Sequence, residues 1–155
     1  MAAATGQESL QISPESPTIR IQLFCPDPVT GWYSEERSVS SHVRPARWQD
    51  VRLPIQDGIP NGRLRLDPVD FPALIEITLL AIRGPSGSDF LWVMEPRDLD
   101  RLTIAGRAMR VPDERSLLLF SFGHDPQLLL PDNISAPVGS SLELRIRIAT
   151  EREPA

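Results

Sequence analysis

Three aspartates that each precede a proline are the carboxylates best placed for chemistry, in the pairs Asp27-Pro28, Asp67-Pro68 and Asp125-Pro126. In such pairs the aspartate oxygen accepts hydrogen bonds from its own backbone while the proline fixes the next φ, so turns are expected. The same carboxylates, with Asp70 or Asp132, are also of the type that holds sugar hydroxyls or Ca²⁺. No spacing matches a calcium loop. We therefore predict no cofactor and leave a structural Ca²⁺ as an unsupported alternative.

Two adjacent aromatic residues, Trp32 and Tyr33, follow a Thr-Gly turn signal and are expected in a loop. Sugar-binding sites place aromatic faces against a pyranose ring, so this pair fits such a site; the alternative is that one ring plugs the end of a sandwich. Arg65 alternates with two leucines and is either an ion-paired strand residue or a ligand-facing fork. The candidate ligand-binding residues are therefore Trp32, Tyr33, Arg65, Asp67, His124 and Asp125.

No catalytic motif is present in the sequence. The nucleophile elbow, the HExxH zinc motif, CxxC and glycine-rich phosphate loops are all missing. The chain has no lysine, and its one cysteine, Cys25, lies in an apolar alternating stretch that favours a structural thiol. We predict a protein that is not an enzyme, with no catalytic residue and no metal ligand. An enzyme of glycan processing, which would require two convergent carboxylates or a His–Asp pair in a deep cleft, stays open as an alternative.

Charge and hydropathy exclude two classes of partner. The formal net charge is −5, and no stretch concentrates arginine enough to form the positive face that nucleic-acid binding needs. The N-terminus lacks the basic and apolar regions of a secretory signal. The longest apolar run, near residues 117–120, is too short to cross a bilayer. We therefore expect no nucleic acid, no membrane insertion and a cytoplasmic location.

The elements that must position these residues are short strands. Apolar residues alternate with polar ones over residues 18–25, 63–66 and 141–149, and residues 73–83 form a continuous β-branched apolar run. Turn signals recur between them, and 16 prolines spread along the chain exclude long helices. This pattern predicts an all-β, antiparallel, jelly-roll-like β-sandwich of eight or nine short strands.

The domain organisation follows from the same pattern. Residues 17–150 are expected to form a single sandwich domain, preceded by a disordered lead-in at residues 1–16 and followed by a tail at residues 151–155. Residues 95–103 are the best candidate for a short helix or turn cluster, and residues 104–111 for one irregular strand. Residues 67–72 form a proline-locked corner before the apolar run, and we expect a ligand at the loops rather than at this corner.

Five short segments occur in a fixed order: EERSV at residues 35–39, WQDVRLP at 48–54, LRLDPVD at 64–70, IEI at 75–77 and DPQL at 125–128. This series resembles accessory β-sandwich regions of bacterial multidomain glycosyltransferases and related polysaccharide-biosynthesis proteins. The resemblance spans about residues 18–149.

The resemblance implies a function that is carbohydrate-binding-like, non-catalytic and accessory to bacterial glycosyltransfer or surface polysaccharide biosynthesis. The partner it implies is a glycan or a glycosyltransferase catalytic domain. It assigns no catalytic residue. The alternative is a structural or protein-interaction β-sandwich that binds no sugar, in which an edge strand docks a partner by β-augmentation.

Overall fold

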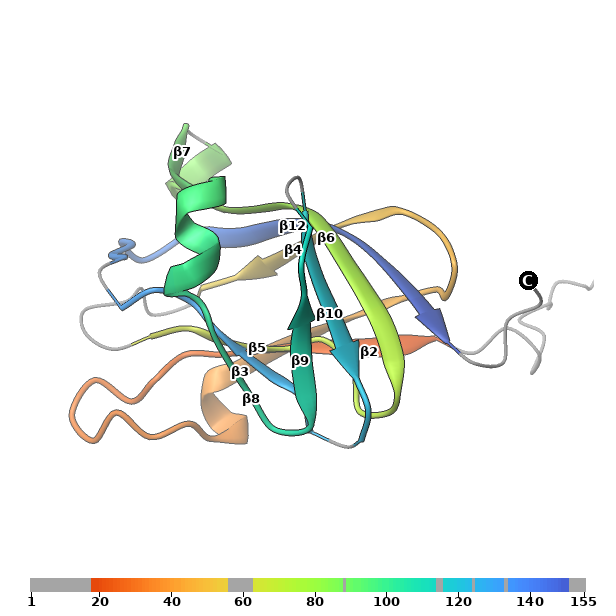
Figure 1. The fold of residues 1–155 in the computed structure, drawn as a ribbon. Helices are drawn as coiled ribbons and strands as arrows, with labels where there is room; N and C mark the ends of the chain where they lie inside the picture. Colours follow the sequence, from red (N-terminus) through yellow and green to blue (C-terminus); the bar gives the residue numbers. More distant parts are fainter. Residues whose placement is uncertain are drawn as a thin grey trace, which may run out of the picture.

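The computed structural model describes residues 18–55, 63–87, 89–113, 116–123, 125–132 and 134–150. Two antiparallel sheets pack face to face in this part of the chain (Figure 1). The all-β sandwich expected from the alternating pattern is confirmed. The expected lead-in at residues 1–16 and tail at residues 151–155 lie outside the described residues.

The first sheet has six strands in the order β4-β12-β6-β10-β9, with β7 paired to β6 beside β10. Its centre is a long antiparallel pair between β6 and β12, which runs from Ser141 opposite Arg83 to Thr150 opposite Ala73. The strands are β4 (Gln49–Pro54), β6 (Ala73–Arg83), β7 (Phe90–Val93), β9 (Ala108–Val111), β10 (Leu117–Ser121) and β12 (Ser141–Thr150).

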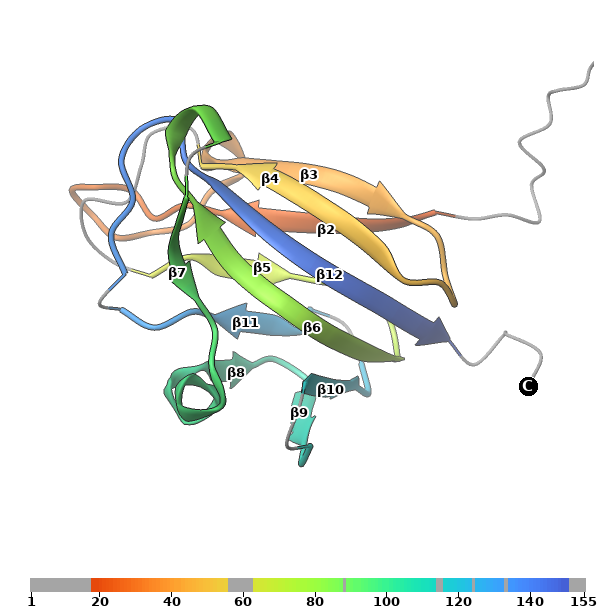
Figure 2. The same cartoon turned by 90° about the horizontal axis from the view of Figure 1, so that it is seen from above.

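The second sheet has five strands in the order β3-β2-β5-β11-β8. They are β2 (Ile19–Phe24), β3 (Ser38–Val43), β5 (Arg65–Asp67), β8 (Thr103–Ala105) and β11 (Gln127–Leu129). The chain passes from one sheet to the other many times, as in a jelly roll, so residues far apart in sequence meet on one face (Figure 2). For example, β5 lies between β2 and β11.

The core lies between the two sheets and is built from the apolar half of each alternating strand. Ile21, Leu23 and Leu66 of the second sheet and Ile75 and Ile77 of the first are fully buried. Burial of one such side chain contributes about 1.5–3 kcal/mol, so the alternation fixes which face of each strand turns inward. The polar residues between them must therefore point outward.

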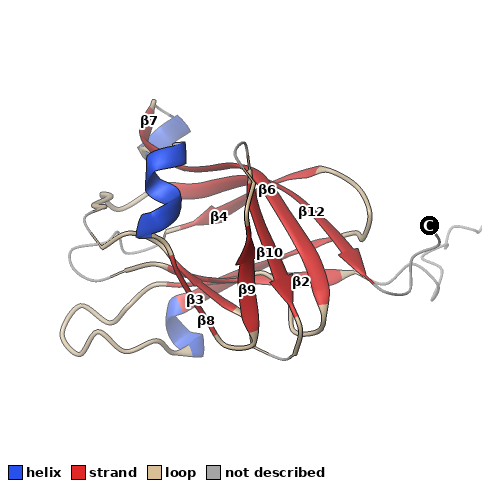
Figure 3. Cartoon of the chain, viewed as in Figure 1, coloured by secondary structure: helices blue, strands red, loops and turns tan. Residues whose placement is uncertain are grey.

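Two details of the expected fold are wrong. The described residues contain eleven strands rather than eight or nine. Part of the difference lies in residues 104–111, because Gly106, at a φ of 78°, ends β8, and β9 then begins in the opposite sheet. The stretch expected as a helix or turn cluster does form one, the 3₁₀ helix η3 (Pro96–Arg101), and two further 3₁₀ turns are η1 (Glu35–Arg37) and η2 (Pro85–Gly87) (Figure 3).

Candidate functional site

The outer face of the five-stranded sheet carries a cluster of polar side chains on β2 and β5. Gln22 lies opposite Asp67, and Phe24 lies opposite Arg65, in the antiparallel register of these two strands. Since the residues between them point into the core, these four side chains share the outer face. The strand alternation thus brings together residues that are more than 40 positions apart in sequence.

Arg65 and Asp67 form a two-pronged ion pair along one strand. The Arg65 Nε donates to Asp67 Oδ1 at 2.8 Å, and Nη2 donates to Asp67 Oδ2 at 2.7 Å. The guanidinium also lies over the ring of Phe24, 4.5 Å from its centroid, and 5.5 Å from that of Tyr33. Paired hydrogen bonds and ring contacts fix an arginine in one orientation, so this fork is rigid before any ligand arrives.

The loop between β2 and β3 folds back onto this face. Tyr33 anchors the loop, because its hydroxyl donates to the backbone carbonyl of Arg63 at 2.8 Å. The Gln22 amide donates to both oxygens of Glu35 at 3.1 Å and to Ser38 Oγ at 2.9 Å. These bonds place the Glu35 carboxylate at the rim of the polar cluster.

Asp125 closes the opposite rim in a strained conformation. Its φ is 62°, in the left-handed region that residues with a Cβ rarely occupy. Its Oδ1 lies 3.6 Å from Arg65 Nη2, and its Oδ2 accepts a hydrogen bond from Gln127 Nε2 at 3.1 Å. Gly106 supports this geometry, because a side chain at Gly106 would collide with the backbone carbonyl oxygen of Asp125.

The polar side chains of β2, β5 and the adjoining loops line an open groove with a volume of about 360 Å³. We call it the polar groove, and it is lined by Arg20, Gln22, Phe24, Glu35, Arg65, Asp67, Val69, Asp70 and Asp125. Four carboxylates face two guanidinium groups in it, and both guanidiniums already have a carboxylate partner: Arg65 is bound by Asp67, and Arg20 lies 3.7 Å from Glu35. Carboxylates are acceptors only, so the groove favours ligands that donate hydrogen bonds and carry no negative charge.

Burial shifts two ionisable groups at this site. It raises the pKa of Asp67, because the charged carboxylate loses water, and the hydrogen bonds from Arg65 offset this only in part. Burial also raises the pKa of Tyr33. The hydrogen bonds to Asp67 raise the pKa of Arg65 still further, so its guanidinium stays charged.

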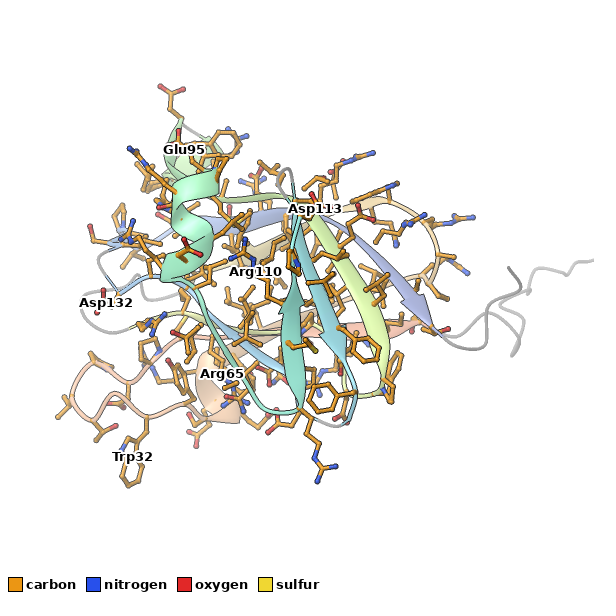
Figure 4. All side chains as sticks on the ribbon, in the orientation of Figure 1. Trp32, Arg65, Glu95, Arg110, Asp113 and Asp132 are labelled. Carbon is orange, nitrogen blue, oxygen red and sulfur yellow. The ribbon has the colours of Figure 1, made fainter. Side chains whose placement is uncertain are left out.

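The structure brings together four of the six residues that the sequence singled out: Tyr33, Arg65, Asp67 and Asp125. Trp32 does not join them; its side chain is 77% exposed and lies apart from Arg65 (Figure 4). The predicted residue His124 lies outside the described residues.

Arg20, Gln22 and Glu35 were missed by sequence reasoning. The alternation over residues 18–25 already turned Arg20 and Gln22 outward, but it did not show that β5 is the neighbouring strand. Glu35 reaches the groove through the loop, which no periodic pattern describes.

Turn chemistry accounts for one of the three Asp-Pro pairs. Asp27 Oδ1 accepts hydrogen bonds from the backbone N–H groups of Val29 at 2.8 Å and Thr30 at 2.9 Å. These bonds lower the pKa of Asp27. Asp67 instead directs its oxygens at Arg65, so its carboxylate faces the groove rather than the local backbone.

The part of the chain that the structure describes has neither a cluster of metal ligands nor a helix that could span a membrane. Within the described ranges, no three histidine, cysteine or acidic side chains are grouped closely enough to hold a metal ion. Among the same residues, no helix has the length and apolar character needed to cross a membrane. Comparisons of the chain with protein-family models, with curated proteins and with solved structures find no match.

Proposed function

We propose that this protein is a non-catalytic glycan-binding module and that the polar groove is its binding site. The observation that carries the proposal is the fixed set of planar polar groups on one sheet face: the Gln22 amide, the Arg65 fork and the Asp67 and Asp125 carboxylates. Sugar hydroxyls both donate and accept hydrogen bonds, and side chains that are already held in place bind them with little further loss of entropy.

The groove is of the size and openness that suits part of a sugar chain. Its volume of about 360 Å³ falls within the usual range for small-ligand sites, and it opens onto the face of a sheet. A polysaccharide could therefore enter the groove at one end and leave it at the other along the surface, which suits the recognition of an internal segment of the sugar chain.

The charge of the groove narrows the class of glycan. Glu35, Asp67, Asp70 and Asp125 face only Arg20 and Arg65, so the groove lining has four acidic groups against two basic ones. An acidic glycan would bring further negative charge against these carboxylates, which costs free energy. The favoured ligands are neutral sugar chains and chains that carry protonated amines.

Aromatic stacking has a minor part in this proposal. The Phe24 ring is covered by the Arg65 guanidinium, and the Tyr33 hydroxyl is bound to the backbone of Arg63. The same guanidinium lies 5.5 Å from the Tyr33 ring centroid, so it competes with a pyranose for both rings. Trp32 is exposed but lies apart from the groove, so it adds at most a peripheral contact.

The proposal is tested by screening the protein on an array of neutral, amine-bearing and acidic glycans, followed by calorimetry on the best ligand. Asp125→Ala removes a rim acceptor that is 62% exposed, and we expect it to weaken binding about tenfold. The matched control is Asp50→Ala, because Asp50 lies on the other sheet and forms an exposed ion pair with Arg145. If the folded protein binds no glycan, or if both variants lose affinity equally, the proposal fails.

The glycosyltransferase association is a proposal that rests on the resemblance of the five ordered segments. In that arrangement the module would hold a growing polysaccharide near a catalytic domain. Co-purification with a glycosyltransferase encoded beside it, in cells that carry both, would support the association. A complex that forms equally well with an unrelated transferase would contradict it.

A further inference from the structure

The strand β7 forms an open edge of the six-stranded sheet and carries exposed apolar side chains. On one side β7 pairs with β6, and no other strand of the described chain pairs with its opposite side. It carries Phe90, Leu91, Trp92 and Val93, and the first, second and fourth of these are 39%, 49% and 40% exposed. Figures 1 and 2 place β7 at the margin of the sandwich, between η2 and η3.

The backbone of β7 offers hydrogen-bonding groups to an incoming strand. Met94 donates its N–H to the carbonyl of Leu80 at 2.9 Å, so Met94 faces β6. Hydrogen-bonding direction alternates along an antiparallel pair, and Val93 opposite Ala81 therefore turns its N–H and C=O toward the open edge. A row of such groups is a template for an added strand.

The other edges of the same sheet are protected, whereas β7 is not. The strand β4 carries Asp50 and Arg52, and β9 carries Arg110, which pairs with Asp100. Charged residues on an edge strand discourage association with another chain. β7 has no charged residue within its bounds, and its exposed apolar side chains would lose water on pairing.

Charge disfavours a second copy of this chain as the source of the strand that pairs with β7. If two copies paired antiparallel through their β7 strands, with the pair centred on Trp92, Leu91 of one copy would lie opposite Val93 of the other. Asp89 would then lie opposite Glu95 at both ends of the pair, and both side chains are exposed. Like charges directly opposite one another are destabilising, and each copy also carries a net charge of −5.

The arginines near β7 do not offset the repulsion between Asp89 and Glu95 in such a pair of copies. Arg83 at one end is paired with Glu143 at 2.6 Å and lies over the Phe90 ring. Arg97 at the other end forms an exposed pair with Glu95, and such pairs contribute little.

We propose that the β7 edge docks an extended segment of a different protein by β-augmentation. That segment carries apolar residues at alternate positions and basic residues at both ends, complementary to Asp89 and Glu95. The edge lies on the other sheet from the polar groove, so a docked segment would not occupy the groove.

Two labelled seven-residue peptides test the proposal by fluorescence anisotropy with the full chain. Both alternate valine with threonine; one ends in lysine on each side and the other in glutamate. We expect the lysine-ended peptide to bind about tenfold more tightly, with the difference shrinking at high salt. We expect Leu91→Ser to weaken its binding about fivefold. Val93→Pro, which removes the outward N–H, should abolish it.

Met109→Ser is the matched control, because Met109 is an exposed apolar residue on the protected edge β9 and should not affect binding. If Val93→Pro fails to fold, as judged by circular dichroism, Leu91→Ser decides. Three results would each overturn the proposal. They are equal binding of the two peptides, no binding of either, and a concentration-dependent dimer in sedimentation that Leu91→Ser disrupts, which would identify a second copy as the occupant.

Discussion

Gly106→Ala should deform the polar groove from outside it. Gly106 does not line the groove, but its Cα faces the backbone carbonyl of Asp125, and an added Cβ would overlap that oxygen. Real Cβ atoms do not approach a backbone atom so closely, so the Asp125 turn must move away. We expect the Asp125 carboxylate to leave its position 3.6 Å from Arg65, and glycan affinity to fall with it.

Two effects contribute to the loss of stability, and a second glycine separates them. Gly106 has a φ of 78°, where a residue with a Cβ costs about 1–2 kcal/mol. The collision adds a cost typical of overpacking, about 1–3 kcal/mol. Gly31 has nearly the same φ, 76°, but a Cβ there would meet nothing within 4 Å. Gly31→Ala therefore measures the backbone term without the collision.

Urea unfolding of both variants is the assay, with calorimetry on the best glycan as the second measurement. We expect Gly106→Ala to lower the free energy of unfolding by about 1–3 kcal/mol more than Gly31→Ala does. Only Gly106→Ala should weaken glycan binding. Equal losses of stability in the two variants would refute the collision. Unchanged affinity in a destabilised Gly106→Ala would refute the role of Asp125 in the site.

Three further predictions concern charged residues. The pKa of Asp67 is raised in the folded chain, so its contribution to the free energy of unfolding is full below the ordinary aspartate pKa and is lost as pH rises through the folded value. Urea midpoints measured across this pH range should show the loss in the wild type and not in Asp67→Asn. The pKa of Asp27 is lowered, so its contribution to the free energy of unfolding is present above the ordinary aspartate pKa and is lost as pH falls through the folded value. Asp27→Ala should remove this loss of stability at acid pH from the same set of urea midpoints. Arg65→Lys keeps the charge but loses the two-pronged bond and the ring contact, so we expect the free energy of unfolding to fall by about 1–2 kcal/mol, and an unchanged urea midpoint would contradict the rigid fork.

The strands that the sequence predicted best are those whose pattern has one explanation. Residues 73–83 match β6 at both ends, because a β-branched apolar run bounded by Pro72 and Gly84 fits little else. The stretch 104–111 was mistaken for one strand, since nothing in its composition shows that Gly106 sends the chain to the other sheet.

The site shows the same division between local and long-range information. Asp27 behaves as the Asp-Pro pattern predicts, because its partners are two and three residues away. Asp67 occurs in the same dipeptide, and its partner Arg65 is also only two residues away, but the two side chains pair along a strand rather than in a turn. The raised pKa of Asp67 comes from burial, which depends on how distant parts of the chain pack. The expectation that a ligand would sit at the loops rather than at the residue 67–72 corner stays untested, but the groove includes both Asp67 and Asp70.

The sequence by itself determined that this chain folds as an antiparallel sandwich, since alternation with period two fixes which residues of each strand are buried. It also determined which side chains of β2 and β5 turn outward. Only the tertiary structure decided that these two strands are neighbours, that the Tyr33 loop folds back over them, and that the missing side chain of Gly106 leaves room for Asp125 beside Arg65. The physical reason is that strand pairing and loop docking join residues distant in the chain, and their free energies depend on contacts that no local pattern encodes.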